Sequence, residues 1–353
     1  TSLGRAGRVD ELDAWIERVA DVGPAPDALS AWAIAFARVA VHLYHSRRLA
    51  EADRMLAAVA AGLQGRDPGA LAEARLAGAR ASRAAVTLDL LAVESYTRAS
   101  LLAYERAGDL RNVCTQATVL GIAEERAGRY ADAERVLLKA IDLARRFRLP
   151  MGMGMTLASL ARVHFVLGDR ARGMQEAREA IDWLSATEHT RLAAIAWCGL
   201  AWMLFETDDL DGAAAAAATA YDVGGFAAVA RQHSLALRAR ILLRRGELDR
   251  ARSLSDEAAA VGGDDRAIFD SEALSDLARI EVRLAHGDTE AAREFAAAAW
   301  GRLVKVSLSF GEAAARRAFL ERVPLHAEVG AVCDRLGVPR GEFGGTVHAK
   351  AAP

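Results

Sequence analysis

The residues with the widest scope for chemistry are arginines and aromatic residues that recur in the middle of the chain. In helices, periodicity places them on one side, away from the partner helix, and Cys198 shares this stripe. An arginine binds a carboxylate or a phosphate through paired hydrogen bonds, and aromatic rings anchor interfaces. The pattern therefore predicts a binding surface formed by these residues: Arg126, Arg162, Phe165, Trp202, Phe205, His233, Arg240 and Arg244.

A purely structural interpretation of the same residues stays open. Trp202 and Phe205 would then seal adjacent units, and the arginines would pair with Glu125 or Glu206. The residue types alone do not distinguish the two interpretations, because arginine and aromatic side chains serve equally in packing and in binding.

Two further patterns are weaker candidates. His42 and His45 lie three residues apart and would form half of a metal site, but no second pair or nearby carboxylate completes it. Gly152 and Gly154 resemble part of a nucleotide-binding loop, but they follow no strand and a third glycine is missing. We therefore interpret the histidines as surface residues and the glycines as a helix start.

The motifs of common enzymes, GxxxxGK[ST], HExxH and GxSxG, are absent from the sequence. We therefore expect a protein that is not an enzyme, with no catalytic residue, no metal site and no cofactor. The adjacent carboxylates Asp208 and Asp209 are interpreted as helix caps. Cys114, Cys198 and Cys333 are isolated, which is typical of buried small apolar residues in a reducing cytoplasm.

The elements that must position these residues follow from a repeat. A unit of about 40 residues recurs, most clearly in Gly121–Ala144, Ala161–Leu184 and Ala201–Val223. A turn is expected in each unit at intervals of 38 to 41 residues, at Gly128, Gly168, Asp208, Gly246 and Gly287. Small residues follow each turn in two sets, which are Ala133, Gly173, Ala213, Ala251 and Ala292, and then Ala140, Ala180, Ala220, Ala258 and Ala299. This repetition predicts an all-α fold, an α-α superhelix of closely packed helix pairs.

The repeat also divides the chain. Residues 1–23 read as the second helix of a truncated repeat, so we expect the chain to begin inside a unit, with a natural half-repeat cap as the alternative. Residues 24–323 form the array. Residues 324–340 should be a terminal capping helix, since the last unit of a solenoid exposes an apolar face. Residues 341–353 should be a flexible tail.

The spacing of small residues resembles that of the tetratricopeptide repeat. The best unit matches the family signature at Leu120 and Gly121 in the first helix, at Gly128, Arg129 and Tyr130 in the turn, and at Ala133 and Ala140 in the second helix. The unit is longer than the usual repeat by about six residues. It departs from the family where an aromatic is expected in the first helix, since Glu124, His164 or Leu204 stands there.

The longer unit looks like a variant from the C-terminal regions of large bacterial signalling proteins, where it follows a Ser/Thr kinase domain or a signal-transduction ATPase domain. The segments Tyr104–Val113 and Arg316–Pro324 resemble sequence segments from the C-terminal arrays of the kinase-type proteins, although the chain carries no kinase signature. The resemblance implies that the first helices line a concave groove.

Composition limits the partners. The net charge is −2, which creates no overall field that would attract nucleic acid. Of the 45 basic residues only Lys139, Lys305 and Lys350 are lysine, which is typical of a GC-rich bacterial genome. No stretch of 18 apolar, uncharged residues occurs. We expect a cytoplasmic protein that binds neither nucleic acid nor membrane.

These inferences lead to one function and two alternatives. The first is a non-catalytic protein- or peptide-binding scaffold of a bacterial signalling protein, which binds through the concave groove. The second is a small-ligand sensor domain of a transcriptional regulator. The third is a self-association module that forms a homo-oligomer.

Overall fold

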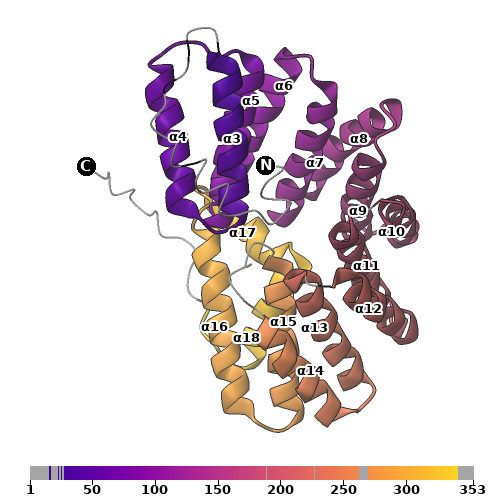
Figure 1. Ribbon diagram of the computed structural model, residues 1–353. Helices are drawn as coiled ribbons and strands as arrows, with labels where there is room; N and C mark the ends of the chain where they lie inside the picture. Colours follow the sequence, from indigo (N-terminus) through magenta and orange to yellow (C-terminus); the bar gives the residue numbers. More distant parts are fainter. Residues whose placement is uncertain are drawn as a thin grey trace. The chain divides into compact units, whose positions relative to one another are not determined.

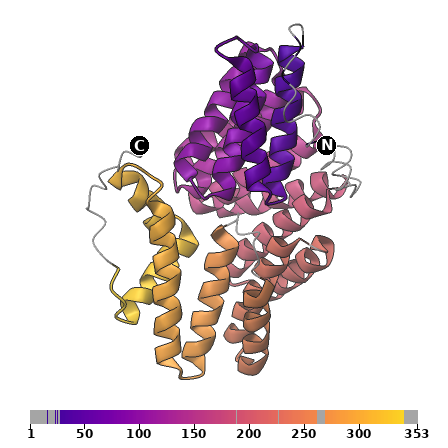
Figure 2. The same cartoon turned by 60° about the vertical axis from the view of Figure 1, so that its left-hand side comes forward.

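The structure, a computed structural model, describes residues 28–187, 189–225, 227–261 and 269–340, together with Ile16, Gly23 and Ala25. The expected truncated repeat at 1–23, apart from Ile16 and Gly23, and the expected tail at 341–353 lie outside the described residues. Every regular element in the described part is an α-helix, as the sequence predicted (Figures 1 and 2). None of the helices described is long and apolar enough to span a bilayer.

The helices carry the labels of Figure 1. In chain order they are α3 (Leu29–His45), α4 (Leu49–Leu63), α5 (Ala70–Val86), α6 (Leu90–Arg106), α7 (Leu110–Arg126), α8 (Tyr130–Arg146), α9 (Pro150–Val166), α10 (Arg170–Ser185), α11 (Thr190–Glu206), α12 (Leu210–Gly224), α13 (Ala228–Arg244), α14 (Leu248–Val261), α15 (Phe269–Ala285), α16 (Thr289–Ser307), α17 (Ala313–Glu321) and α18 (Pro324–Arg335).

The 40-residue unit consists of two equally spaced helices. From α5 to α12, each helix begins 20 residues after the previous one. The five expected turn residues all have positive φ, from 63° at Asp208 to 104° at Gly168, which confirms the predicted register. Glycine adopts this left-handed conformation without steric cost, and it ends one helix so that the next can start. The connection between α8 and α9 uses Arg148 instead, with φ 50°.

Aspartates start the helices that follow several of these turns. The side chain of Asp169 accepts a hydrogen bond from the backbone N–H of Arg172, and that of Asp209 accepts one from Gly212. The capping role expected of Asp208 and Asp209 is therefore confirmed for Asp209, whereas Asp208 is the left-handed turn residue. A cap of this kind stabilises a helix by about 1 kcal/mol.

The chain forms two compact units. The N-terminal unit comprises the described residues up to Ala123 and the segment Val136–Arg148. The C-terminal unit comprises Glu124–Arg135 and the described residues from Leu149 onward. The last turn of α7 and the first turn of α8 therefore belong to the C-terminal unit.

Small residues let the helices approach closely in both units. Both sets of small residues predicted from the repeat are buried. In the C-terminal unit a Cβ added at Gly173 would lie 2.6 Å from the carbonyl oxygen of Ala161, so α9 and α10 touch through backbone atoms. In the N-terminal unit Leu137 packs directly on Gly121 and is fully buried. Leu137 fills the space between small residues, as expected.

The end of the chain packs on more than the last repeat. The helix α18 contacts α15, α16 and α17, as a capping helix would. In addition, a Cβ at Gly128 would lie 2.5 Å from the carbonyl oxygen of Ala318, and the hydroxyl of Tyr130 donates to the carbonyl of Arg322 at 3.4 Å. Within the C-terminal unit, α17 therefore lies against the α7–α8 turn, 192 residues away in sequence. The domain boundaries at 323 and 340 remain a prediction.

Candidate binding site

A pocket in the C-terminal unit contains half of the predicted groove residues. It encloses about 510 Å³ of empty space, part of it open to solvent. The first helices α7, α9, α11 and α13 form one side, and the turn between α17 and α18 forms the other. The lining residues are Glu125, Arg126, Tyr130, Arg162, Val166, Gly199, Trp202, His233, Val323, Pro324 and Leu325.

The polar wall of the pocket is an ion pair. The Nε and Nη2 atoms of Arg162 donate to the two carboxylate oxygens of Glu125 at 2.5 and 2.7 Å. The two side chains are only 19% and 8% exposed, respectively. A paired guanidinium and carboxylate that are both largely buried hold each other in place. This arrangement orients the wall, and it is the pairing of Arg162 with Glu125 that the structural interpretation of the sequence named.

The apolar wall is built around Trp202. Its ring contacts that of Phe165 edge to face, with centroids 5.3 Å apart, and its side chain lies at the pocket. Trp202 is 8% exposed, and its buried indole Nε1–H has no hydrogen-bond acceptor among the described residues. Leaving a buried donor unpaired costs about 1–3 kcal/mol.

The C-terminal wall was not expected from the sequence. Val323, Pro324 and Leu325 close the pocket opposite the first helices, where the repeat pattern had indicated only an end cap. Pro324 occupies the first turn of α18, where its fixed φ favours a helix start. No repeat spacing links this turn to Trp202 or Arg162, so the periodicity carried no signal for it.

Three predicted residues form a separate cluster outside the pocket. Arg240 is 3% exposed, donates to Glu281 at 2.9 Å, and pairs also with Glu328. The guanidinium groups of Arg240 and Arg244 lie 5.0 and 4.9 Å from the ring centroid of Phe205. This cluster therefore ties together α11, α13, α15 and α18.

The electrostatics of this cluster favour the charged arginine. Burial alone would lower the pKa of Arg240, but the carboxylates of Glu281 and Glu328 outweigh it and hold the pKa above its usual value. Arg240 and Glu281 both lie six residues before a turn glycine, Gly246 and Gly287 respectively. The pair thus joins the same position in two consecutive units.

The predicted site residues therefore divide into two groups. Arg126, Arg162, Trp202 and His233 line the pocket. Phe165 lies behind Trp202, whereas Phe205, Arg240 and Arg244 belong to the separate cluster. The three aromatic residues predicted to line the groove, Phe165, Trp202 and Phe205, are all buried, so little of their surface is left for a ligand. First helices of neighbouring units pack side by side, and large rings on their flanks fill the space between them. The role of the eight residues in binding remains a prediction.

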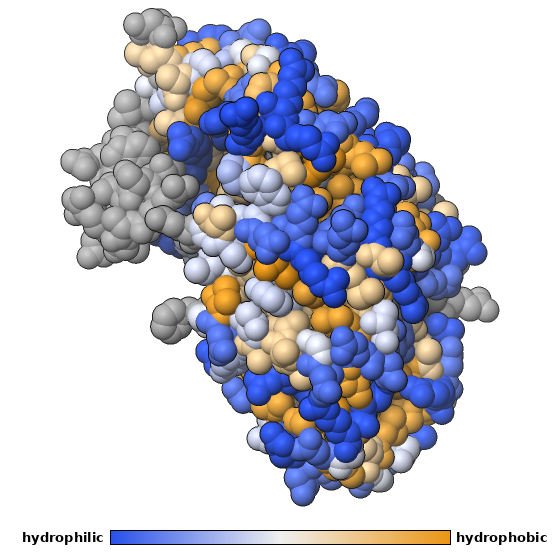
Figure 3. Space-filling model, turned by 90° about the vertical axis from the view of Figure 1, so that its right-hand side faces the viewer, coloured by the Kyte–Doolittle hydropathy of each residue, from blue (hydrophilic) through white to orange (hydrophobic). Residues whose placement is uncertain are grey.

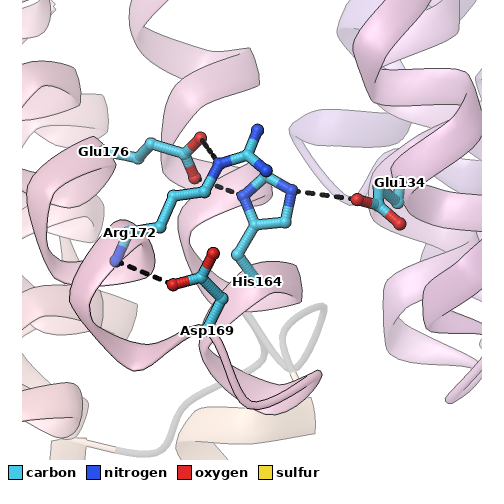
Figure 4. A network of polar contacts seen from close by, with 5 residues as sticks. All are labelled: Glu134, His164, Asp169, Arg172 and Glu176. Atoms are coloured by element: carbon cyan, nitrogen blue, oxygen red, sulfur yellow. Dashed lines mark hydrogen bonds and ion pairs between the residues drawn. The ribbon is translucent and has the colours of Figure 1, made fainter.

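A polar network occupies the position where the repeat family has an aromatic (Figure 4). His164 is buried on α9, with Nδ1 2.5 Å from Glu176 on α10 and Nε2 3.2 Å from Glu134 on α8. Arg172 donates to the same Glu176 at 3.0 Å. Each ring nitrogen of His164 thus lies within hydrogen-bond distance of a carboxylate. The network links three successive helices, and Glu124 replaces the aromatic in the preceding unit by pairing with Arg129.

Other motifs noted in the sequence are structural. Gly152 and Gly154 lie in the first turns of α9, which confirms the helix-start interpretation. All three cysteines are free and buried, as expected. Burial raises the pKa of the Cys198 thiol to about 12 and that of Cys333 to about 11. No group of three metal-ligating side chains occurs within the described ranges.

One outer face of the molecule exposes little contiguous apolar surface that a partner could bury. Figure 3 shows hydrophobic areas on this face that are small and separated by hydrophilic residues. Scattered apolar residues are normal on a protein surface, and it is contiguous patches that mark interfaces. The pocket is the better candidate site.

Comparisons with known proteins concern the fold. No family model matches this chain, and no curated protein matches it in sequence. Among solved structures, it is similar to a Rap protein complexed with Competence and Sporulation Factor, at 14% identity and a TM-score of 0.61 over 95% of this chain and 96% of that one.

It is also similar to the apo form of RapI, at 11% identity and a TM-score of 0.58 over 95% and 96% of the two chains. Aspartyl phosphate phosphatase F from Bacillus subtilis matches at 11% identity and a TM-score of 0.51 over 90% and 95%. The fold is thus a tetratricopeptide-like array of helical repeats, as the sequence predicted.

Proposed function

We propose that this chain is a non-catalytic scaffold that binds a peptide, or an extended segment of a protein, in the pocket of the C-terminal unit. The observation that supports this proposal most directly is the pocket itself. It combines apolar walls from Trp202 and Val323–Leu325 with a polar wall formed by the Arg162–Glu125 ion pair. Such a site suits an apolar side chain of an extended peptide.

The pocket is preformed, because contacts between its own side chains fix its walls. The Arg162–Glu125 pair and the contact between Phe165 and Trp202 fix the side chains on neighbouring helices. A preformed site loses little conformational entropy on binding, which favours affinity. The same reasoning gives Arg162 a positioning role rather than direct recognition of an anion.

A regulatory role in a bacterium is part of this proposal. It is supported by a Rap protein complexed with Competence and Sporulation Factor and by a Bacillus subtilis phosphatase, both of which share the fold. The rarity of lysine and the free cysteines favour a bacterial, cytoplasmic protein. A larger parent protein with a kinase or ATPase domain remains a proposal from the sequence resemblance.

A small-ligand sensor is the second candidate. It is favoured by the lining of the pocket, because small-molecule sites likewise combine mostly apolar walls with a few polar groups. A metabolite that binds only the native state would raise the melting temperature, whereas a peptide-binding scaffold would respond to no metabolite of a library.

Gly199 provides a way to test the pocket without disturbing the fold. It lines the pocket on α11, and a Cβ added there would meet no heavy atom within 4 Å. Phenylalanine at this position should fill the pocket, and it should not weaken the helix, since glycine is a poorer helix former. Gly301→Phe on α16 is the matched control, because a Cβ there also meets nothing and the residue does not line the pocket.

The experiment is selection of peptides from a displayed random library, followed by fluorescence anisotropy with the purified wild type and both variants. We expect peptides with an apolar side chain to bind the wild type and Gly301→Phe equally. Gly199→Phe should weaken them by about tenfold or more, which corresponds to about 1.4 kcal/mol. Selected peptides that bind Gly199→Phe as well as the wild type would refute the pocket as the binding site.

A further inference from the structure

A second hollow lies in the N-terminal unit and has a different chemical character. It is a groove of about 990 Å³, open to solvent, along the first helices α3 and α5. Its floor includes Ala37, Val41 and the buried ring of Tyr104. The polar side chains around it are Arg38, His42, His45, Arg75, Ser82 and Gln116.

These polar groups are donors, and no carboxylate belongs to the described residues that line the groove. Arginine has only donors, and serine, glutamine and histidine can each donate as well as accept. In the part of the chain that the structure describes, Arg38 and Arg75 join no ion pair. Nearby carboxylates have other partners, since Asp53 pairs with Arg83 and Glu73 with Arg106.

The guanidinium group of Arg75 lies 5.4 Å from the centroid of the Tyr104 ring, and Arg38 lines the same groove. Burial is the main cause that raises the pKa of Tyr104, and the charges of both Arg75 and Arg38 counteract it. The charge of Asp109 also raises the pKa of Tyr104. The carboxylate of Asp109, however, accepts hydrogen bonds from the backbone and side-chain N–H groups of Asn112, and it does not line the groove.

We propose that this groove binds a phosphorylated ligand, with the phosphate held between Arg38 and Arg75. A tetrahedral phosphate offers several acceptor oxygens, and each guanidinium can donate two parallel hydrogen bonds to them. The stacking of Arg75 on the fixed Tyr104 ring orients its donor groups before the ligand arrives. The length of the groove leaves room for the remainder of the ligand beyond Ser82 and Gln116.

This assignment also suits the two histidines of the groove, His42 and His45. Both line the groove near the end of α3, and no third metal-ligating group accompanies them in the described part of the chain. A ring N–H of His42 can supply a further donor to the anion.

The test is isothermal titration calorimetry of the full chain with pyrophosphate and with inorganic phosphate at constant ionic strength. Arg38→Gln and Arg75→Gln should each weaken pyrophosphate binding by about tenfold or more, because each removes charge-assisted hydrogen bonds. Arg80→Gln is the matched control, since Arg80 is exposed on α5 and does not line the groove. It should change affinity by less than about twofold.

Arg38 makes the test independent of folding, because it is exposed and its loss breaks no described ion pair. Absence of saturable pyrophosphate binding up to about 10 mM would overturn the proposal, as would equal losses in Arg38→Gln and Arg80→Gln. Malonate that binds as tightly as pyrophosphate would overturn the phosphate assignment. Gly199→Phe in the other unit should bind pyrophosphate like the wild type, so failure here and failure of the proposed peptide site are separate results.

Discussion

Arg75 in the N-terminal unit and Arg162 in the C-terminal unit lie on first helices of their pairs, and both line a hollow. Arg162 is neutralised by Glu125 from the preceding first helix, whereas Arg75 stacks on Tyr104 and meets no described carboxylate. The same residue type thus orients an apolar pocket in one unit and leaves an anion-binding groove in the other. The residue that the neighbouring helix presents decides between the two outcomes.

The strongest test of this contrast removes the most buried guanidinium of the C-terminal unit. Arg240→Met leaves Glu281 and Glu328 together without their cation, so we expect the free energy of unfolding to fall by about 3 kcal/mol. Urea denaturation measures this loss. Arg244→Met is the matched control, because Arg244 lies over the same ring but is 54% exposed, and it should cost less than about 1 kcal/mol. Equal losses would mean that contact with Phe205, and not charge pairing, stabilises this cluster.

A smaller loss of stability is expected from a variant that tests whether the chain end packs on the α7–α8 turn. Gly128→Ala places a Cβ in a left-handed residue and 2.5 Å from the carbonyl of Ala318, so we expect a loss of about 2 kcal/mol. Gly246→Ala has the same backbone strain with open space around the Cβ, and should cost about 1 kcal/mol. Thermal unfolding of both variants gives the difference. If the two losses are the same, α17 does not lie against this turn.

The smallest effect concerns the N-terminal unit alone. Arg148 is exposed and has φ 50°, a conformation that glycine adopts more easily. Arg148→Gly should therefore stabilise this unit by about 0.5–1 kcal/mol.

Thiol labelling during urea denaturation reports on the unfolding of each unit separately, since Cys114 lies in the N-terminal unit and Cys198 and Cys333 lie in the C-terminal unit. Buried thiols with raised pKa react only after opening. In Arg148→Gly, labelling of Cys114 should shift to higher urea while that of Cys198 stays unchanged. A shift of both by the same amount would show that the units unfold together.

The sequence alone determined the helical repeat, the turns and the close contacts between helices. Gly128 and Gly168 mark turns because few other residues adopt positive φ, and Ala140 and Ala180 mark contacts because nothing larger fits. Each of these constraints acts between neighbouring residues or recurs in every repeat, so one amino-acid sequence is enough to reveal it. The side of each helix that carries Arg162 and Trp202 also follows from periodicity.

Only the tertiary structure decided which partners those side chains have. Periodicity left open whether Arg162 would face a ligand or Glu125, and it gave no indication that Arg240 would meet Glu328, 88 residues away. The wall formed by Val323–Leu325 depends on where the chain end returns, which no repeat spacing records. Burial of the aromatic rings likewise depends on how closely neighbouring first helices pack. Partner choice is a long-range property, because it is set by the stagger of whole helices rather than by the residues next to each side chain.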